Sequence, residues 1–161
     1  MSPSVYIAPL ERVVPPRRLE RARRRFAEAT VFNWLTAGTD AHAKDYALIH
    51  IGGTTALAPL YDLMSAALVM DERDVFYQGK FAMKLGGHYG IRRIGWREVE
   101  KAAAELTVDS DWLVQRAKEM YEAIPAAFTD AVDEAGAVID SAVGQQFKEG
   151  IANLIGRLKP I

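Results

Sequence analysis

The sequence contains no cysteine, which excludes disulfide bonds and thiolate metal sites. It has no apolar run of about 18 residues, so no membrane-spanning helix is expected. Its first ten residues also lack the basic-then-apolar pattern of a signal peptide. The formal net charge of −1 creates no overall field toward nucleic acid or membrane. We therefore expect a cytoplasmic protein with no membrane partner.

Glycine-rich phosphate-binding loops are also missing. Neither G-x-G-x-x-G nor G-x-x-x-x-G-K-[ST] occurs, and Gly79-Lys80 lacks both the following Ser/Thr and the earlier glycine. The usual sequence signal for a cradle of backbone amides around a nucleotide is therefore absent.

With 161 residues, half of them hydrophobic, the chain is long enough for one domain with a buried core. Prolines at positions 3, 9, 15 and 16 predict an extended lead-in over residues 1–16, followed by a domain over residues 17–161. Apolar residues recurring every three to four positions predict a helix over residues 17–37, which Gly38 would end. Residues 46–60 predict a hairpin with a Gly52-Gly53 turn.

The second half of the chain reads as mainly helical. Residues 96–106 and 138–158 are predicted helices, and Ser110 can cap another that Pro125 should kink or divide. Asp62 can cap a short helix through Leu68, and residues 71–95 show the least regular pattern. The predicted fold is mainly α with one small β-hairpin, and the residues of chemical interest lie on or beside that hairpin.

Three aspartates have the spacing of a phosphoryl-transfer site. Such a site needs an acidic group that orients the attacking hydroxyl and oxygen ligands for magnesium, one of them five residues after that acid. Asp40, Asp45 and Asp62 stand where these roles would be placed. We expect their three carboxylates to surround one cavity. A polar loop with local capping roles is the alternative explanation of the same residues.

Two further patterns compete with this interpretation. Zinc would need three or four ligands, and His50 and His88 do not have helpful spacings around Asp40, His42 and Asp45. The basic residues between positions 17 and 25 could contact phosphates, but no aromatic residue interleaves them, which disfavours direct nucleic-acid binding. A solvated helix face, or a surface that meets another part of a larger protein, explains these arginines equally well.

Three sequence blocks resemble a known family. They begin at Phe32 (FNWLTAGTDAHAKD), Leu57 (LAPLYDLMS) and Phe81 (FAMKLGG), and in this order they are similar to the catalytic region of HipA-family serine/threonine kinases. The resemblance covers about residues 29–106. It implies the mainly helical C-lobe of a kinase-like fold, and a toxin that pairs with a DNA-binding antitoxin.

The resemblance also implies roles for individual residues. Asp40 would be the catalytic base, and Asp45 and Asp62 would bind magnesium. The nucleotide phosphates of ATP would lie beside His42, Lys44 and Asp45, with Tyr61 next to Asp62. The chain departs from the family at Asp45, where asparagine is usual, so a charged oxygen replaces a neutral one.

Two functions follow as hypotheses. The first is ATP γ-phosphoryl transfer to a serine or threonine of a protein substrate, weak or absent in this chain alone because the phosphate loop and its lysine are not in the sequence. The second is a non-catalytic interaction module that binds an antitoxin or a separate kinase N-lobe. We also expect self-association or a tight partner through apolar surface near residues 48–60 and the helix after Arg17.

Overall fold

The computed structural model describes residues 4–158, apart from the side chains of Ser4, Tyr6, Ala43 and Glu72. The chain forms α1 (Ser4–Val13), α2 (Pro16–Leu35), α3 (Glu72–Gln78), α4 (Trp96–Leu106), α5 (Ser110–Ala135) and α6 (Ser141–Arg157). Two separate antiparallel hairpins complete it: β1 (Leu48–Ile51) with β2 (Thr54–Leu57), and β3 (Lys80–Leu85) with β4 (His88–Gly90). The mainly α prediction is confirmed, but the prediction of one hairpin missed the second.

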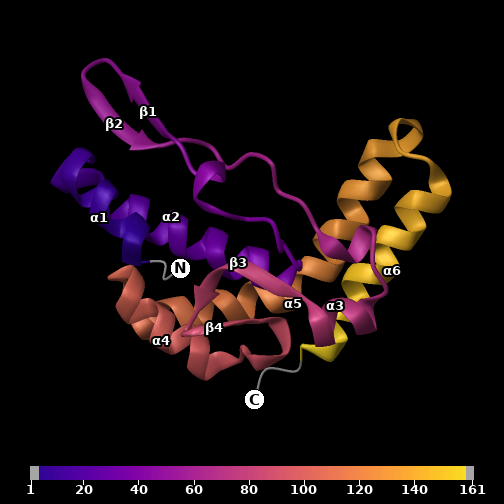
Figure 1. Cartoon of the computed structure of the whole chain (residues 1–161). Helices are drawn as coiled ribbons and strands as arrows, with labels where there is room; N and C mark the ends of the chain where they lie inside the picture. Colours follow the sequence, from indigo (N-terminus) through magenta and orange to yellow (C-terminus); the bar gives the residue numbers. More distant parts are fainter. Residues whose placement is uncertain (1–3, 159–161) are drawn as a thin grey trace.

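Helix α2 is the central element of the fold, with α4 and α5 packed against it and the β1–β2 hairpin above its first half (Figure 1). Its C-terminal half is almost wholly buried, with Phe26, Val31, Trp34 and Leu35 each at most 1% exposed. Large apolar side chains at this spacing dominate the burial that drives folding. Because this end of α2 is packed in the core, the position at which the segment after Leu35 begins is fixed.

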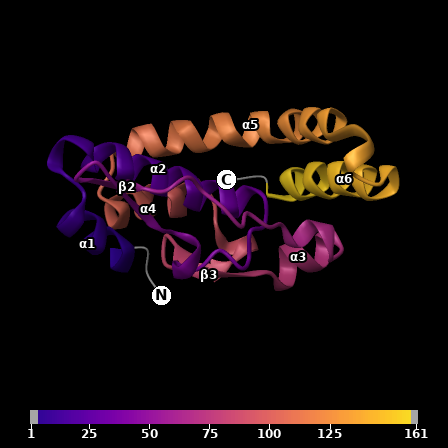
Figure 2. The ribbon, with the colours of Figure 1, turned by 90° about the horizontal axis from the view of Figure 1, so that it is seen from above.

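The remaining helices enclose the other side of the core. The buried face of α4 includes Val99, Ala102 and Ala103, which pack in the same cluster as Leu113 of α5 and Leu154 of α6. Figure 2, viewed from above, shows α5 lying along the length of the molecule with α6 returning beside its C-terminal part.

The predicted extended lead-in is wrong for the residues that the structure describes. Residues Ser4–Val13 form a helix even though Pro9 lies inside it; residues 1–3 lie outside the described part. Ile7, Leu10 and Val14 recur at helical spacing and are each 4% exposed or less, packed in the main core cluster. Their burial outweighs the backbone hydrogen bond that a proline removes.

Several local predictions also need correction. Asp109, not Ser110, caps α5 by accepting from the Trp112 amide, and Pro125 does not divide the helix, which continues through it to Ala135. Ser65, not Asp62, caps the short 3₁₀ turn Ala66–Leu68. Residues 71–95, the stretch with the least regular pattern, contain α3 and the β3–β4 hairpin.

The helices predicted over residues 17–37 and 96–106 correspond to α2 and α4, and the Gly52-Gly53 turn is confirmed by two positive φ angles, 56° and 72°. In the described part of the chain, no helix combines the length and the low polarity that a bilayer crossing requires.

Candidate functional site

The segment that carries Asp40 begins where α2 ends. Ala37 adopts a left-handed φ of 54°, and the Gly38 amide donates to the Asn33 carbonyl at 2.7 Å. A Cβ on Gly38 would lie 2.6 Å from Asn33 Oδ1, so this close approach requires glycine. The exposed Asp40 follows two residues later.

Asn33 and Tyr46 hold the two ends of this segment together. Asn33 is 5% exposed, and its Nδ2 donates to the Tyr46 hydroxyl at 3.0 Å. The Tyr46 ring packs edge-on against Phe26, with 4.7 Å between the ring centroids. Residues 38–45 therefore form a loop that is tied at both ends to one buried helix.

His42 and Asp45 form a local pair inside the loop. Asp45 Oδ2 accepts from the His42 backbone amide at 2.8 Å and lies 2.9 Å from His42 Nδ1. The pair is ionic only when the imidazole is protonated. Asp45 is mostly buried, with 15% of its side chain exposed, whereas 43% of the His42 side chain is exposed. One oxygen of Asp45 thus fixes the loop, and the other stays uncommitted.

After the β1–β2 hairpin the chain returns to the same loop. The Tyr61 hydroxyl donates to the Lys44 carbonyl at 2.9 Å, and Ser65 Oγ donates to the Thr36 carbonyl at 2.6 Å. The Ala66 amide also donates to the Ala37 carbonyl at 3.0 Å. These contacts place Asp62 between two attachment points, one on the loop at Lys44 and one just after α2 at Thr36 and Ala37, which agrees with the expected proximity of the two aspartate segments.

Asp62 itself occupies a strained backbone conformation. Its φ is 53°, in the left-handed region that residues with a Cβ rarely adopt. The side chain is exposed, and the neighbouring Leu63 and Met64 are 48% and 60% exposed. Backbone strain of this kind is often found at functional sites.

The predicted site residues are therefore partly assembled. Among residues 4–158, neither the Asp40 nor the Asp62 carboxylate forms a hydrogen bond or ion pair, so both can accept a ligand. The expected cluster of three carboxylates is not formed, because no group of three or more acidic or histidine side chains in the described residues is arranged for one metal ion. The assignment of Asp45 and Asp62 as a two-carboxylate pair remains a prediction.

Carboxylate oxygens nevertheless fit magnesium, which is commonly held by one or two carboxylates together with substrate phosphates. Asp62 and the free oxygen of Asp45 are such donors. Lys44, exposed on the same loop, supplies a positive charge that suits phosphate.

Sequence reasoning missed the residues that position the loop. Asn33, Tyr46 and Ser65 touch none of the predicted reacting groups, yet they fix both aspartate segments. A signal existed in Asn33, a polar residue at a position where the helical pattern requires burial. No such signal marked Ser65, whose partner is 29 residues away.

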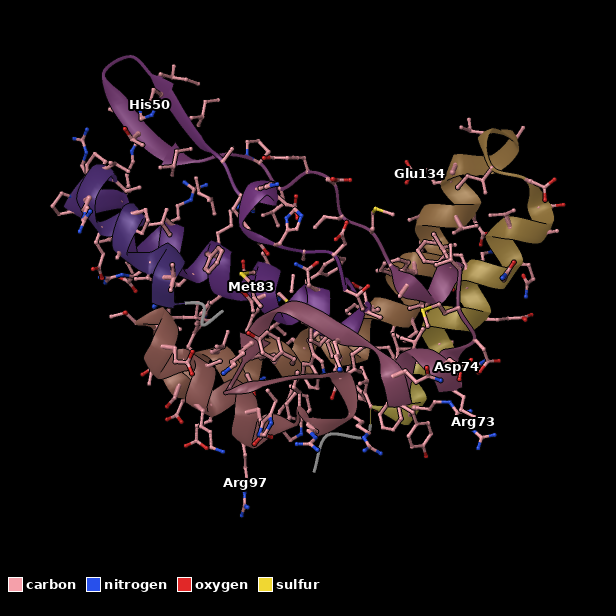
Figure 3. All side chains as sticks on the ribbon, viewed as in Figure 1. His50, Arg73, Asp74, Met83, Arg97 and Glu134 are labelled. Atoms are coloured by element: carbon pink, nitrogen blue, oxygen red, sulfur yellow. The ribbon has the colours of Figure 1, made fainter. Side chains whose placement is uncertain are left out.

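The cavity behind the loop and the hollow at the α4–α5 junction are lined by none of the predicted site residues. Behind the loop, a cavity of about 10 Å³ between α2 and β3, near Met83 in Figure 3, has room for one water molecule at most. His50 lies on the hairpin, apart from this region (Figure 3).

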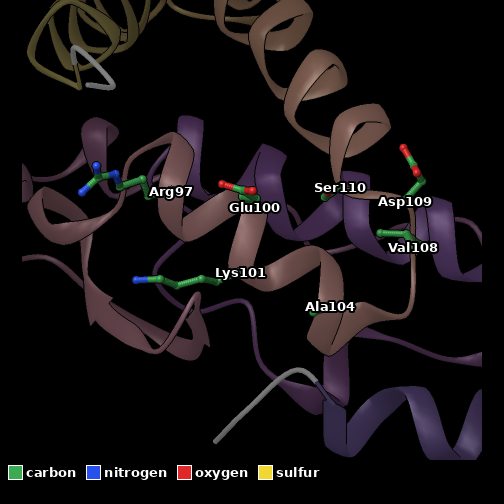
Figure 4. Close-up of a pocket in the computed structure, with 7 residues that line it drawn as sticks. All are labelled: Arg97, Glu100, Lys101, Ala104, Val108, Asp109 and Ser110. Atoms are coloured by element: carbon green, nitrogen blue, oxygen red, sulfur yellow. The ribbon is translucent and has the colours of Figure 1, made fainter.

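A larger open hollow of about 840 Å³ lies at the junction of α4 and α5 (Figure 4). Its charged side chains have both signs, with Arg97 and Lys101 beside Glu100 and Asp109. None of the predicted catalytic or nucleotide-binding residues lines it, so it does not form part of the candidate site.

Comparison with known proteins agrees with this architecture. The chain is 27% identical over 136 residues to a Sinorhizobium fredii protein named "Putative kinase Y4mE", covering 82% of this chain and 30% of that protein. Its fold matches a chain from the toxin–antitoxin complex of HipA, HipB and operator DNA from Shewanella oneidensis MR-1, with a TM-score of 0.77 and 17% identity. That match covers 99% of this chain and 35% of the other.

The chain thus spans about a third of the length of these two proteins. The family profile described as "HipA-like C-terminal domain" matches residues 6–131, which include most of α1, the Asp40 loop and the Asp62 turn. The chain therefore belongs to the family of HipA-like C-terminal domains.

Proposed function

We propose that this chain is the C-terminal lobe of a HipA-like serine/threonine protein kinase, with its site formed by the Asp40 loop and the Asp62 turn. The observation that carries the proposal is the pair of attachments between these segments, Tyr61 to Lys44 and Ser65 to Thr36. Segments some twenty residues apart in sequence are held side by side, as a base and a metal ligand that act on one phosphate group must be.

Each residue has a role in the proposed reaction. Asp40, exposed and unpaired within the described residues, accepts the proton of the substrate hydroxyl. Asp62 and the free oxygen of Asp45 hold magnesium, which neutralises charge on the phosphates of ATP when bound. Lys44 contacts phosphate directly, and His42 keeps Asp45 in place through their contact.

The second candidate function is a protein-interaction module. It is favoured by exposed apolar side chains on and beside the segments that bear the site: Ile51 is 66% exposed, Met64 60% and Val69 82%. Such apolar surface is typical of a face that another protein covers. The partner would be an antitoxin, a kinase N-lobe or a second copy of the chain, in the cytoplasm.

Both candidates can be tested by one set of reactions. The chain is combined with the N-terminal two thirds of a HipA-like relative, and transfer from γ-labelled ATP to serine or threonine is measured with and without magnesium. We expect magnesium-dependent transfer that Asp40→Asn abolishes. The matched control Asp74→Asn, on α3, should leave transfer unchanged.

Stable association of the two parts without transfer would favour the interaction module over the kinase. If the parts neither associate nor transfer phosphate, both proposals fail. The chain alone should bind ATP with magnesium weakly, and calorimetry that finds tight binding would contradict the expected need for another lobe.

A further inference from the structure

A groove between α2 and β2 gathers three arginines on one wall. Arg18, Arg21 and Arg25 stand at positions i, i+3 and i+7, so they share one face of the helix. The groove measures about 510 Å³ and is lined on the other side by Ala56, Leu57 and Pro59. Its lining residues come mainly from α2 and β2, and Figure 1 shows the β1–β2 hairpin passing over the first half of α2.

The arginines of this helix differ in their pairing. Arg23 forms an ion pair with Glu11, and Arg24 forms one with Glu20 at 2.6 Å. None of the three groove arginines pairs with a carboxylate anywhere in residues 4–158, and no acidic residue lines the groove. Within the described residues, their one side-chain hydrogen bond runs from Arg18 Nη1 to Thr54 Oγ1 at 3.3 Å. The groove therefore holds three positive charges that nothing in the described chain neutralises.

The opposite wall is apolar and carries no aromatic side chain. Single-stranded nucleic acid is usually held by base stacking on aromatic rings in addition to phosphate contacts, and this groove offers none. A ligand with carboxylates on one side and small apolar groups on the other would complement both walls. Guanidinium groups bind carboxylates through paired hydrogen bonds, which adds geometric selectivity to the charge attraction.

The spacing of the arginines further defines the ligand. Along α2, Arg18, Arg21 and Arg25 are separated by rises of about 4.5 and 6 Å. Side chains on one face of an extended peptide recur every 6–7 Å or so. Long arginine side chains can bridge the small difference, so alternate residues of an extended strand match the three guanidinium groups.

We propose that this groove is a binding site for an acidic peptide segment in which carboxylate and small apolar residues alternate. The site is distinct from the Asp40 and Asp62 segments. It gives a role to three of the arginines between positions 17 and 25, which the proposed phosphoryl transfer does not use.

The test uses the whole chain and a fluorescein-labelled seven-residue peptide of alternating glutamate and valine, followed by fluorescence anisotropy. We expect saturable binding that weakens as salt rises. The double variant Arg21→Gln/Arg25→Gln should bind the peptide with an affinity lower by a factor of about ten or more. The control Arg12→Gln/Arg17→Gln removes the same charge from exposed positions outside the groove and should bind as the wild type does.

Two comparison ligands make the result specific. A peptide of the same composition with its glutamates grouped at one end should bind at least several-fold more weakly, and equal binding would overturn the proposed alternating pattern. A labelled twelve-residue oligothymidylate that binds more tightly than the peptide, with the same arginine dependence, would replace the proposal with a nucleic-acid site.

Sedimentation of the wild type and the two double variants tests whether a second copy of the chain occupies the groove. If the wild type self-associates and only the groove variant does not, the groove binds a second copy and the peptide proposal fails. Circular dichroism melts of both variants establish that they fold. If the folded groove variant binds the alternating peptide as tightly as the wild type does, the proposal is also overturned.

Discussion

The segment that carries Asp40 is fastened to the buried end of α2, whereas the segment that carries Asp62 crosses the surface. Asn33, at 5% exposure, and Tyr46 hold the first segment. The second has the exposed Tyr61 on one side of Asp62 and the buried Ser65 on the other, with Asp62 itself at a φ of 53°. The proposed base, Asp40, thus has a rigid support, whereas Asp62, one of the two proposed metal ligands, sits on a less supported turn.

Because of this difference, substitutions in the two segments should affect different properties, stability in one and ligand binding in the other. Changes in the Asp40 support should lower the free energy of unfolding, because they disturb packed and hydrogen-bonded groups. Changes in the Asp62 turn should leave the fold nearly intact and act on ligand binding.

The largest effect is expected at the close approach of Gly38 to Asn33. Gly38→Ala places a Cβ 2.6 Å from Asn33 Oδ1, so Asn33 must move and its bond to Tyr46 is disturbed. We expect the free energy of unfolding to fall by about 2 kcal/mol, measured by urea denaturation. Gly156→Ala is the control: nothing lies within 4 Å of its Cβ in α6, and the change should stabilise by about 0.5–1 kcal/mol. Equal changes in the free energy of unfolding for Gly38→Ala and Gly156→Ala would contradict the predicted role of the Gly38 contact.

Two tyrosine hydroxyls provide a matched pair. Tyr46→Phe leaves the buried Asn33 Nδ2 without its hydroxyl acceptor and should lower the free energy of unfolding by about 1–2 kcal/mol. Tyr61→Phe removes an exposed hydrogen bond to the Lys44 carbonyl, which water can replace, and should cost less than about 0.5 kcal/mol. Thermal unfolding of the two variants gives the comparison directly, and a larger loss for Tyr61→Phe would reverse it.

The strained backbone at Asp62 predicts an unusual order of stabilities. Glycine adopts a positive φ at no steric cost, whereas alanine does not, so Asp62→Gly should be more stable than Asp62→Ala by about 1 kcal/mol. At ordinary positions on a chain the order is reversed, because glycine loses more conformational freedom on folding. Denaturant unfolding of both variants measures the difference, and the ordinary order would show that the turn is not held at positive φ.

The smallest effect serves as a pH reference outside both segments. Glu98 Oε2 accepts from the Gly95 amide at 3.1 Å at the start of α4. Burial raises the pKa of Glu98, but hydrogen bonds from Lys101 and the Gly95 amide, with the charge of Lys101, lower it overall from its ordinary value of 4.5. A lowered pKa means that the folded state holds its proton less tightly than the unfolded chain does.

The stabilising contribution of Glu98 is therefore present above about pH 4.5 and is lost as the pH falls through the lowered pKa. Glu98→Gln should cost about 0.5 kcal/mol at neutral pH, and the difference from the wild type should shrink in acid. Melting temperatures between neutral pH and pH 3 or so test this. A difference that grows on acidification would contradict the assigned direction.

Local sequence patterns predict the elements whose burial repeats along the chain, but they do not predict elements that depend on contacts with distant residues. Helices α2 and α4 follow from apolar periodicity, because one face of each is buried along its length. The first helix was missed because four prolines are a strong local signal, whereas the burial of Ile7 and Leu10 depends on distant residues. The β3–β4 hairpin was missed because its glycines indicate turns without indicating which strands pair.

The candidate site shows the same division. Spacing and resemblance predicted a site formed by the Asp40 and Asp62 segments, and these two segments do lie together, whereas the chemical roles of the aspartates stay a prediction. The gathering of three carboxylates was predicted incorrectly, because the orientation of side chains in a loop depends on contacts such as that of Asp45 with His42. Those contacts are set by backbone geometry that residue spacing does not specify.

The most direct test of the proposed site is a melting curve with divalent cations. A metal that binds the folded state at Asp45 and Asp62 stabilises it by linkage. We predict that millimolar magnesium or manganese raises the melting temperature of the wild type, and that Asp62→Ala abolishes most of the rise. Asp45→Asn should weaken it by removing a charge, and Asp74→Ala should retain it. A wild-type melting temperature that is unaffected by both cations would contradict the assignment of Asp45 and Asp62 as metal ligands.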